Sequence, residues 1–248
     1  MALIAANLGF LWKELPFPTR ISNAKSAGFT AVEFHDEAQL QDIDAVKRVL
    51  NETGLPVLSL NTRMGETAGL AAIPNQQDQA RADIDDAIRA AHAVNAKAIH
   101  VVAGKADGEE ARDAYVSSLI YAAENFDGTI LIEPISRSAI PGYFLFSLYQ
   151  ARDIADTVNN PRLKMMFDFF HVRSLGYNVL EVAQEFLPFI GHIQISGWPN
   201  RDEPELAGSL IGLLRALGYE EDFGAEYRPK ANIEDGLAWL KPALSAAE

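Results

Sequence analysis

Short apolar runs recur along the chain, separated by longer segments in which apolar residues have helical spacing. The runs occupy residues 3–6, 31–34, 57–60, 98–102, 130–132, 163–167, 190–195 and 223–226. Short apolar runs of this kind, bounded by turn residues, are typical of buried strands. The pattern predicts eight strands.

Between these runs, apolar residues recur at intervals of three and four, which is the spacing of one helix face. Four such faces are Ile84, Ala87, Ile88 and Ala91; Val116, Leu119, Ile120 and Ala123; Val179, Val182, Ala183 and Phe186; and Leu210, Leu213, Leu214 and Leu217. Gly28, Gly54 and Gly218 each follow a helical segment. A glycine there can adopt the left-handed conformation that ends a helix.

Strands that alternate with helices predict a parallel sheet, and eight such units predict closure into a barrel. We therefore expect an α/β fold consisting of a single (β/α)8 TIM barrel. A doubly wound open sheet is the alternative, but no Gly-x-Gly-x-x-Gly motif follows the first strand. Because such barrels commonly reach about 250 residues, residues 1–248 are expected to form one domain.

Composition excludes several classes of partner and site. The formal net charge is −13, which repels polyanions and argues against a nucleic-acid partner. There are no cysteines, so neither a disulfide framework nor a thiolate metal site can form. The chain begins without a basic leader, and no apolar run approaches the length of a membrane span. We therefore expect a cytoplasmic protein without a membrane partner.

Four successive predicted strands end in an oxygen-bearing side chain. These are Glu133, Asp168, Gln194 and Glu226. A carboxylate at the end of a buried strand is costly unless it is paired or binds a cation. Strand ends of a barrel converge on one mouth, so the four side chains are expected to meet. Hard oxygen ligands favour Mg²⁺ or Mn²⁺, with Zn²⁺ or Co²⁺ as further options.

Three of the five histidines have two interpretations each. His171 follows Asp168 in an Asp-x-x-His motif and either donates to a substrate oxygen or makes a local loop contact. His192 lies two residues before Gln194, so it either supports the site from beneath or is a core histidine. His100 carries the same ambiguity. His35 could reach the mouth, and His92 is expected to face outward.

Arginines after the last two strands could bind an anionic substrate, because a guanidinium matches a carboxylate. They are Arg201 and Arg228, and a loop salt bridge is the alternative for each. The longest irregular stretches, residues 62–77 and 134–146, follow the third and fifth strands, where barrel enzymes place active-site loops. Their candidate substrate contacts are Arg63, Glu66, Arg137 and Tyr143.

Longer motifs surround these positions and extend over nearly the whole chain. They are Ala5-Ala6-Asn7-Leu8, His100-Val101-Val102-Ala103-Gly104, Ile132-Glu133-Pro134-Ile135, Pro141-Gly142-Tyr143-Phe144-Leu145, Asp168-Phe169-Phe170-His171, Gly191-His192-Ile193-Gln194-Ile195, Pro199-Asn200-Arg201-Asp202-Glu203-Pro204 and Glu226-Tyr227-Arg228-Pro229. Together they resemble the hydroxypyruvate isomerase family, which belongs to the xylose-isomerase-like barrel superfamily.

The resemblance implies one divalent metal ion held by Glu133, Asp168, Gln194 and Glu226, with Glu133 and Glu226 also acting as the acid/base pair. It implies an aldose-ketose type isomerase that moves a proton between adjacent carbons of a small hydroxy-carbonyl substrate. Such a reaction passes through an enediolate, whose charge needs electrostatic stabilisation.

Two departures from the family pattern leave the substrate open. The family usually has Arg-His-Glu-Pro where this chain has Arg201-Asp202-Glu203-Pro204, and a lysine where this chain has Arg228. Hydroxypyruvate, a related small hydroxy-keto acid and a ketose all remain candidates.

Three other functions are consistent with parts of the pattern. A ketose 3-epimerase would use the same metal and the same two carboxylates. A DNA-repair nuclease on this barrel would need a histidine-rich multi-zinc cluster, which five scattered histidines and the negative charge disfavour. A non-catalytic or sensing barrel is favoured only by the altered segment after Gln194. The oligomeric state is left open, with a homo-oligomer among the options.

Overall fold

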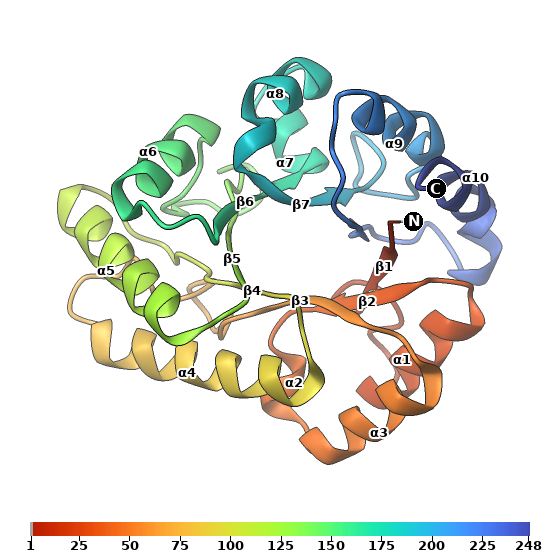
Figure 1. Ribbon diagram of the computed structural model, residues 1–248, viewed down its shortest axis with the longest axis horizontal. Coiled ribbons are helices and arrows are strands. Elements are labelled where there is room, and N and C mark those ends of the chain that lie inside the picture. The colour runs from red at the N-terminus through yellow and green to blue at the C-terminus, as the bar shows by residue number, and fades with distance from the viewer. Residues whose placement is uncertain (1) are drawn as a thin grey trace.

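The computed structural model describes residues 2–248, in which eight parallel strands close into a barrel with helices around it (Figure 1). Each strand pairs with the next along the chain, and the last pairs with the first. The strands are β1 (Ile4–Asn7), β2 (Ala31–Phe34), β3 (Val57–Asn61), β4 (Ala98–His100), β5 (Thr129–Ile132), β6 (Leu163–Asp168), β7 (Ile190–Ile195) and β8 (Phe223–Ala225). The predicted TIM barrel is confirmed.

Helices cover the outside of the barrel. They are α1 (Phe17–Ser26), α2 (Glu37–Leu40), α3 (Ile43–Thr53), α4 (Gln77–Val94), α5 (Glu109–Asn125), α6 (Leu148–Val158), α7 (Phe169–Ser174), α8 (Val179–Phe186), α9 (Ala207–Ala216) and α10 (Leu240–Ala246), with the 3-10 helices η1 (Leu187–Phe189) and η2 (Glu234–Trp239). The main hydrophobic core contains residues of both the strands and these helices.

The sequence predicted the positions of the helices better than it predicted which residues of each helix are buried. The predicted faces of α4 and α8 are buried throughout. On α5 and α9 the predictions were partly wrong, because Ile120 and Leu213 are 41% and 50% exposed. Small alanines are buried on α5 in place of Ile120. Gly28, Gly54 and Gly218 all have positive φ, as predicted for helix ends.

Side chains of a strand point alternately to opposite faces, so every second residue of a barrel strand faces the interior. These inward-facing side chains form two layers along the barrel axis. Small or apolar residues form the lower layer in two clusters, Ala5, Ala31 and Leu58, and Ala98, Leu131 and Met166. Two residues further along five of these six strands, towards their carboxyl ends, come polar side chains: Asn7, Glu33, His100, Glu133 and Asp168. The apolar layer therefore forms the floor beneath a polar layer at the mouth.

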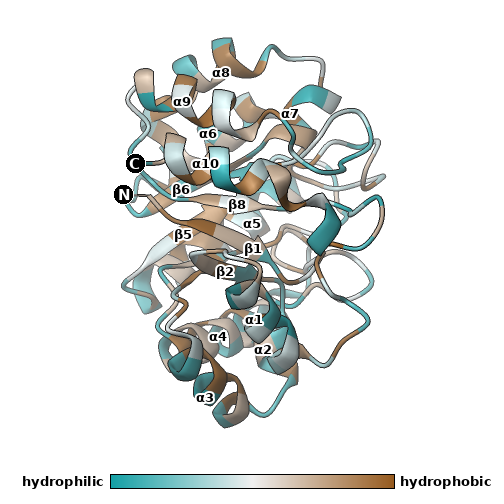
Figure 2. Cartoon of the chain, turned by 90° about the vertical axis from the view of Figure 1, so that its right-hand side faces the viewer, coloured by the Kyte–Doolittle hydropathy of each residue, from teal (hydrophilic) through white to brown (hydrophobic). Residues whose placement is uncertain are grey.

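Long loops extend from the carboxyl ends of the strands, while the two termini lie at the opposite end of the barrel (Figure 2). The terminal segments are joined there by a hydrogen bond in which Ala2 N donates to Ala247 O at 3.0 Å. At the mouth, neighbouring loops bond to one another: Ala72 N donates to Ala103 O, and Phe144 N donates to Gly104 O. The loops after β3, β4 and β5 thus support each other.

Substitution of Gly69 by alanine is expected to destabilise these loops. Gly69 has φ +102°, and a Cβ there would lie 2.2 Å from Val102 O. Strain and overpacking should together lower the free energy of unfolding by roughly 2–5 kcal/mol.

Gly65→Ala is the matched control, because Gly65 lies in the same loop, has φ +53° and has no neighbour within 4 Å of the added Cβ. It should lower the free energy by roughly 1 kcal/mol. Urea denaturation followed by circular dichroism measures both. Equal losses in the two variants would contradict the close approach of the loops.

Within residues 2–248, no helix combines the length and apolar character needed to cross a membrane.

Candidate active site

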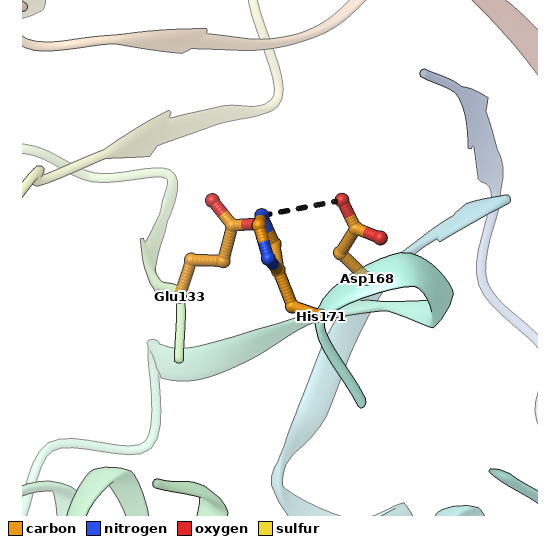
Figure 3. A group of neighbouring side chains, drawn as sticks. All are labelled: Glu133, Asp168 and His171. Carbon is orange, nitrogen blue, oxygen red and sulfur yellow. Dashed lines mark ion pairs between the residues drawn. The ribbon is translucent and has the colours of Figure 1, made fainter. Parts of the chain in front are cut away.

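The four predicted strand-end residues lie buried in the polar layer at the barrel mouth. Glu133 follows β5, Asp168 ends β6, Gln194 lies on β7 and Glu226 follows β8. Asp168 and Gln194 are direct partners in the β6–β7 register. Potential ligand atoms of Glu133, Asp168 and His171 lie within 4.8 Å of one another, and Figure 3 shows these side chains converging from β5, β6 and α7.

The buried guanidinium of Arg201 joins two of the candidate ligands. Its Nη2 donates to Asp168 Oδ2 at 2.5 Å and to Glu226 Oε1 at 2.6 Å. The rings of Phe10 and Phe170 each lie 4.9 Å from the guanidinium carbon, which favours a cation at this position. Arg201 is therefore held in the site by charge and by aromatic faces.

His171 is also drawn into this cluster. Arg201 Nη1 lies 3.1 Å from His171 Nε2, and since arginine can only donate, Nε2 is the acceptor. The other ring nitrogen, Nδ1, faces Ser136, whose backbone N donates to it at 3.3 Å and whose Oγ lies 3.2 Å away. Burial lowers the pKa of His171 to about 4, with Arg201 also lowering it and Asp168 opposing the shift. The ring is therefore neutral at pH 7.

If all were ionised, the carboxylates of the mouth would carry more negative charge than one arginine balances. Burial raises the pKa of Glu133 well above its ordinary value, and the charges of Asp168 and Glu226 raise it further. Burial also raises the pKa of Glu226 to about 8, although Arg201 opposes the shift. Additional positive charge would stabilise this site.

Two buried oxygen atoms at the mouth have no hydrogen-bond donor among residues 2–248. They are Glu133 Oε1 and Gln194 Oε1. A buried acceptor without a donor is costly, and carboxylate and amide oxygens are the ligands that hard divalent cations prefer. The residues present therefore fit a divalent ion, with Glu133, Asp168, Gln194 and Glu226 as its candidate ligands.

Two residues that sequence reasoning missed form hydrogen bonds directly to these candidate ligands. Glu33 on β2 accepts from Gln194 Nε2 at 2.8 Å and lies 2.6 Å from His192 Nε2. Asn7 on β1 donates from Nδ2 to Glu33 Oε1 and to Glu226 Oε2, both at 2.9 Å. His192 is buried and pairs with Glu33, which is consistent with both of its predicted roles. The sequence did give one indication of a role for Glu33, because it is the charged residue within the apolar run 31–34.

The remaining histidines lie in different surroundings. His100 is buried on β4, with Nδ1 3.9 Å from Glu133 Oε2. Burial lowers its pKa to about 3, and its Nε2 has no partner within the described residues. His35 stacks edge-on against Phe10, with ring centroids 5.8 Å apart. His92 is exposed, as predicted.

The other candidate substrate contacts have varied surroundings. The side chain of Arg228 is exposed, and only its backbone N–H reaches the site loop, donating to Arg201 O. Arg137 stacks on Phe146 at 3.7 Å. Tyr143 is buried, and its hydroxyl accepts from Ala103 N at 3.0 Å, which joins two loops. Arg63 is half-buried and Glu66 is exposed.

Comparison with known proteins places this chain in a family. The chain matches the family described as xylose isomerase-like TIM barrel over residues 21–243. A solved structure described as AP endonuclease, family 2, from Brucella melitensis superposes with a TM-score of 0.92 at 28% identity, covering 98% of this chain and 99% of that one. The chain belongs to the xylose isomerase-like TIM barrel family.

Two relatives narrow this assignment. The putative hydroxypyruvate isomerase of Danio rerio is 38% identical over 260 residues, covering 95% of this chain and 93% of that protein. The 2-oxo-tetronate isomerase of Pectobacterium atrosepticum is 34% identical over 259 residues, covering 98% of each chain. Within its family, the protein is an isomerase of the hydroxypyruvate and 2-oxo-tetronate isomerase type.

The nuclease alternative required a histidine-rich zinc cluster. Among residues 2–248, the histidine, cysteine, aspartate and glutamate side chains that gather three potential ligand atoms within 4.8 Å of one another are Glu133, Asp168 and His171, a group with a single histidine. One histidine and two carboxylates differ from the histidine-rich set of ligands that the nuclease would need.

Proposed function

We propose that the protein is a metal-dependent isomerase that interconverts a small hydroxy-aldehyde and hydroxy-keto acid pair. The observation that carries this proposal is the buried group of three carboxylates and one amide, in which Glu133 Oε1 and Gln194 Oε1 have no donor in the described structure. A divalent ion bound by Glu133, Asp168, Gln194 and Glu226 would stabilise negative charge that develops on substrate oxygens.

Glu133 and Glu226 are the proposed acid/base pair. They belong to opposite ends of the ligand set, after β5 and β8, and each is almost fully buried. One carboxylate removes the proton from carbon, and either the same group or the other returns it to the neighbouring carbon. Phe10 and Phe170, which flank Arg201, are the side chains proposed to limit access of water to that proton.

His171 and Arg201 are the proposed substrate-binding groups. The relatives are named for hydroxypyruvate and 2-oxo-tetronate, both small oxo acids with a carboxylate. The Arg201 guanidinium suits that carboxylate, and His171 supplies a neutral nitrogen beside it. His100, next to Glu133, is a further candidate contact. Arg228 would need to turn inward to take part.

Removal of metal ions is expected to stop the reaction. We expect enzyme dialysed against EDTA to lose turnover of hydroxypyruvate or 2-oxo-tetronate, and Mg²⁺ or Mn²⁺ to restore it. Carried out in D₂O and followed by NMR, the same assay should show deuterium entering at carbon. Full activity in rigorously metal-free buffer would contradict the metal requirement.

The same NMR spectra separate isomerisation from the alternatives. Isomerisation moves the carbonyl to the neighbouring carbon, whereas a ketose 3-epimerase leaves the carbonyl in place and inverts one centre. A screen of small hydroxy-keto acids and ketoses that gives neither product nor exchange, with any of Mg²⁺, Mn²⁺, Co²⁺ or Zn²⁺, would favour a non-catalytic barrel.

A further inference from the structure

A buried carboxylate that is not among the candidate metal ligands lies at the centre of the polar layer. Glu33 on β2 is 1% exposed. Its carboxylate lies against Gly224 on β8, where a Cβ would come within 2.4 Å of both carboxylate oxygens. The space that Gly224 leaves open is therefore filled by the charged end of Glu33.

Three donors from two other strands converge on this carboxylate. Glu33 Oε1 accepts from Asn7 Nδ2 at 2.9 Å and from Gln194 Nε2 at 2.8 Å. Glu33 Oε2 pairs with His192 Nε2 at 2.6 Å. Because an ionised carboxylate can only accept hydrogen bonds, all three partners are obliged to turn a donor toward it.

This requirement fixes the orientation of Gln194. A side-chain amide has a donor end and an acceptor end of nearly equal size, and only its partners decide which way it points. Glu33 binds the NH₂ end, so Gln194 Oε1 is turned away from Glu33 and remains buried without a donor. A flipped amide would instead direct two N–H groups toward the cation position.

Glu33 also fixes the orientation of Asn7. The Asn7 Nδ2 group bridges Glu33 Oε1 and Glu226 Oε2, and its Oδ1 accepts from Gly9 N at 3.0 Å. Both ends of the Asn7 amide are therefore engaged in hydrogen bonds. Through Asn7, one buried carboxylate is connected to the proposed acid/base residue Glu226.

We propose that Glu33 is the positioning residue of the site, which selects the oxygen of Gln194 as a metal ligand and holds Asn7 against Glu226. The inference rests on the proposed function in one respect, that Gln194 binds a cation. It explains why an amide can serve among the ligands: a carboxylate at 194 presents oxygen in either orientation, whereas an amide must be oriented.

Four variants test this role through the affinity for Mn²⁺, measured by isothermal titration calorimetry. Glu33→Met has similar size but no acceptor, and it should weaken binding by roughly 10- to 100-fold, the usual effect of removing a group that orients a ligand. Glu33→Gln should retain most of the affinity. One oxygen still accepts from Asn7 and Gln194, while His192 adopts the tautomer that accepts from the new amide.

The discriminating variant is the double substitution Glu33→Met with Gln194→Glu. It should restore Mn²⁺ affinity, because the carboxylate at 194 needs no orienting partner. Gln194→Glu alone places two carboxylates 2.8 Å apart by the present Gln194 to Glu33 distance and should bind more weakly than the double variant. A double-mutant cycle gives the coupling. Glu33→Met with unchanged affinity, or without recovery in the double variant, would overturn the proposal.

A second readout needs neither metal nor activity. In a ¹H–¹⁵N spectrum, the Gln194 side-chain NH₂ signals, identified by their disappearance in Gln194→Glu, should be downfield-shifted and slow to exchange with solvent. If wild-type protein binds no Mn²⁺, the metal requirement of the proposed function fails while this signal still tests Glu33. If Glu33→Met does not fold, rapid exchange of the wild-type signals alone would refute the fixed amide.

Discussion

Replacement of Glu226 by glutamine is expected to abolish isomerisation while the fold survives. General acid-base catalysis contributes about 100- to 10,000-fold, and an amide cannot accept the proton from carbon. Glutamine retains an acceptor for one of the two present donors, Arg201 Nη2 and Asn7 Nδ2. It also leaves one fewer of the three crowded carboxyl groups, so the free energy of unfolding should change little.

Glu133→Gln should have the same effect for the same reason. Because Glu133 Oε1 has no hydrogen-bond donor in the wild-type protein, the substitution breaks no hydrogen bond at that atom. Because both glutamates are also proposed metal ligands, kcat must be measured at saturating Mn²⁺, together with deuterium exchange at carbon. Glu52→Gln, on the exposed face of α3, is the control and should be indistinguishable from wild type. A near-wild-type rate in either active-site variant would show that the acid/base roles are wrongly assigned.

Arg201→Met should weaken substrate binding and strengthen metal binding. Loss of a charged hydrogen bond to the substrate carboxylate, worth about 1.5–3 kcal/mol, should raise KM by roughly 10- to 100-fold. Metal affinity should increase, because the Arg201 guanidinium now binds Asp168 and Glu226, two of the proposed ligands. Without metal the variant should unfold more easily, since two buried carboxylates lose their counter-charge.

Two further arginine variants separate charge from geometry. Arg201→Lys keeps the charge but loses the planar fork, so we expect a raised KM with a smaller gain in metal affinity. Arg228→Met alters an exposed side chain and should leave both quantities near wild type. KM by steady-state kinetics and Mn²⁺ affinity by calorimetry measure these effects. Unchanged KM and unchanged affinity in Arg201→Met would exclude Arg201 from both roles.

The strands and strand-end residues could be predicted from sequence because barrel geometry is periodic. A buried strand is visible as an apolar run, and the residue that ends it must lie at the mouth. Asp168 and Gln194 could therefore be assigned to one site although they are 26 positions apart in the sequence, and the register confirms that they are neighbours.

Side-chain direction could not be predicted in the same way. Nothing in the segment around Arg201 indicates that its guanidinium turns back onto Asp168 while Arg228 stays exposed. Glu33 was overlooked because it lies within an apolar run, and its partners come from β1 and β7, far away in the sequence. On the helices, Ile120 and Leu213 have the right spacing, but the packing of neighbouring helices decided which positions are buried.

The hydrogen bond between Ala2 and Ala247 has a practical consequence for handling the protein. It brings the beginning and the end of the chain together at the base of the barrel, on the side away from the mouth (Figure 2). An affinity tag or fusion partner attached at either terminus therefore projects away from the active site. A short peptide could also join the two ends, which would allow circularly permuted enzymes to be opened at a surface loop without cutting any strand.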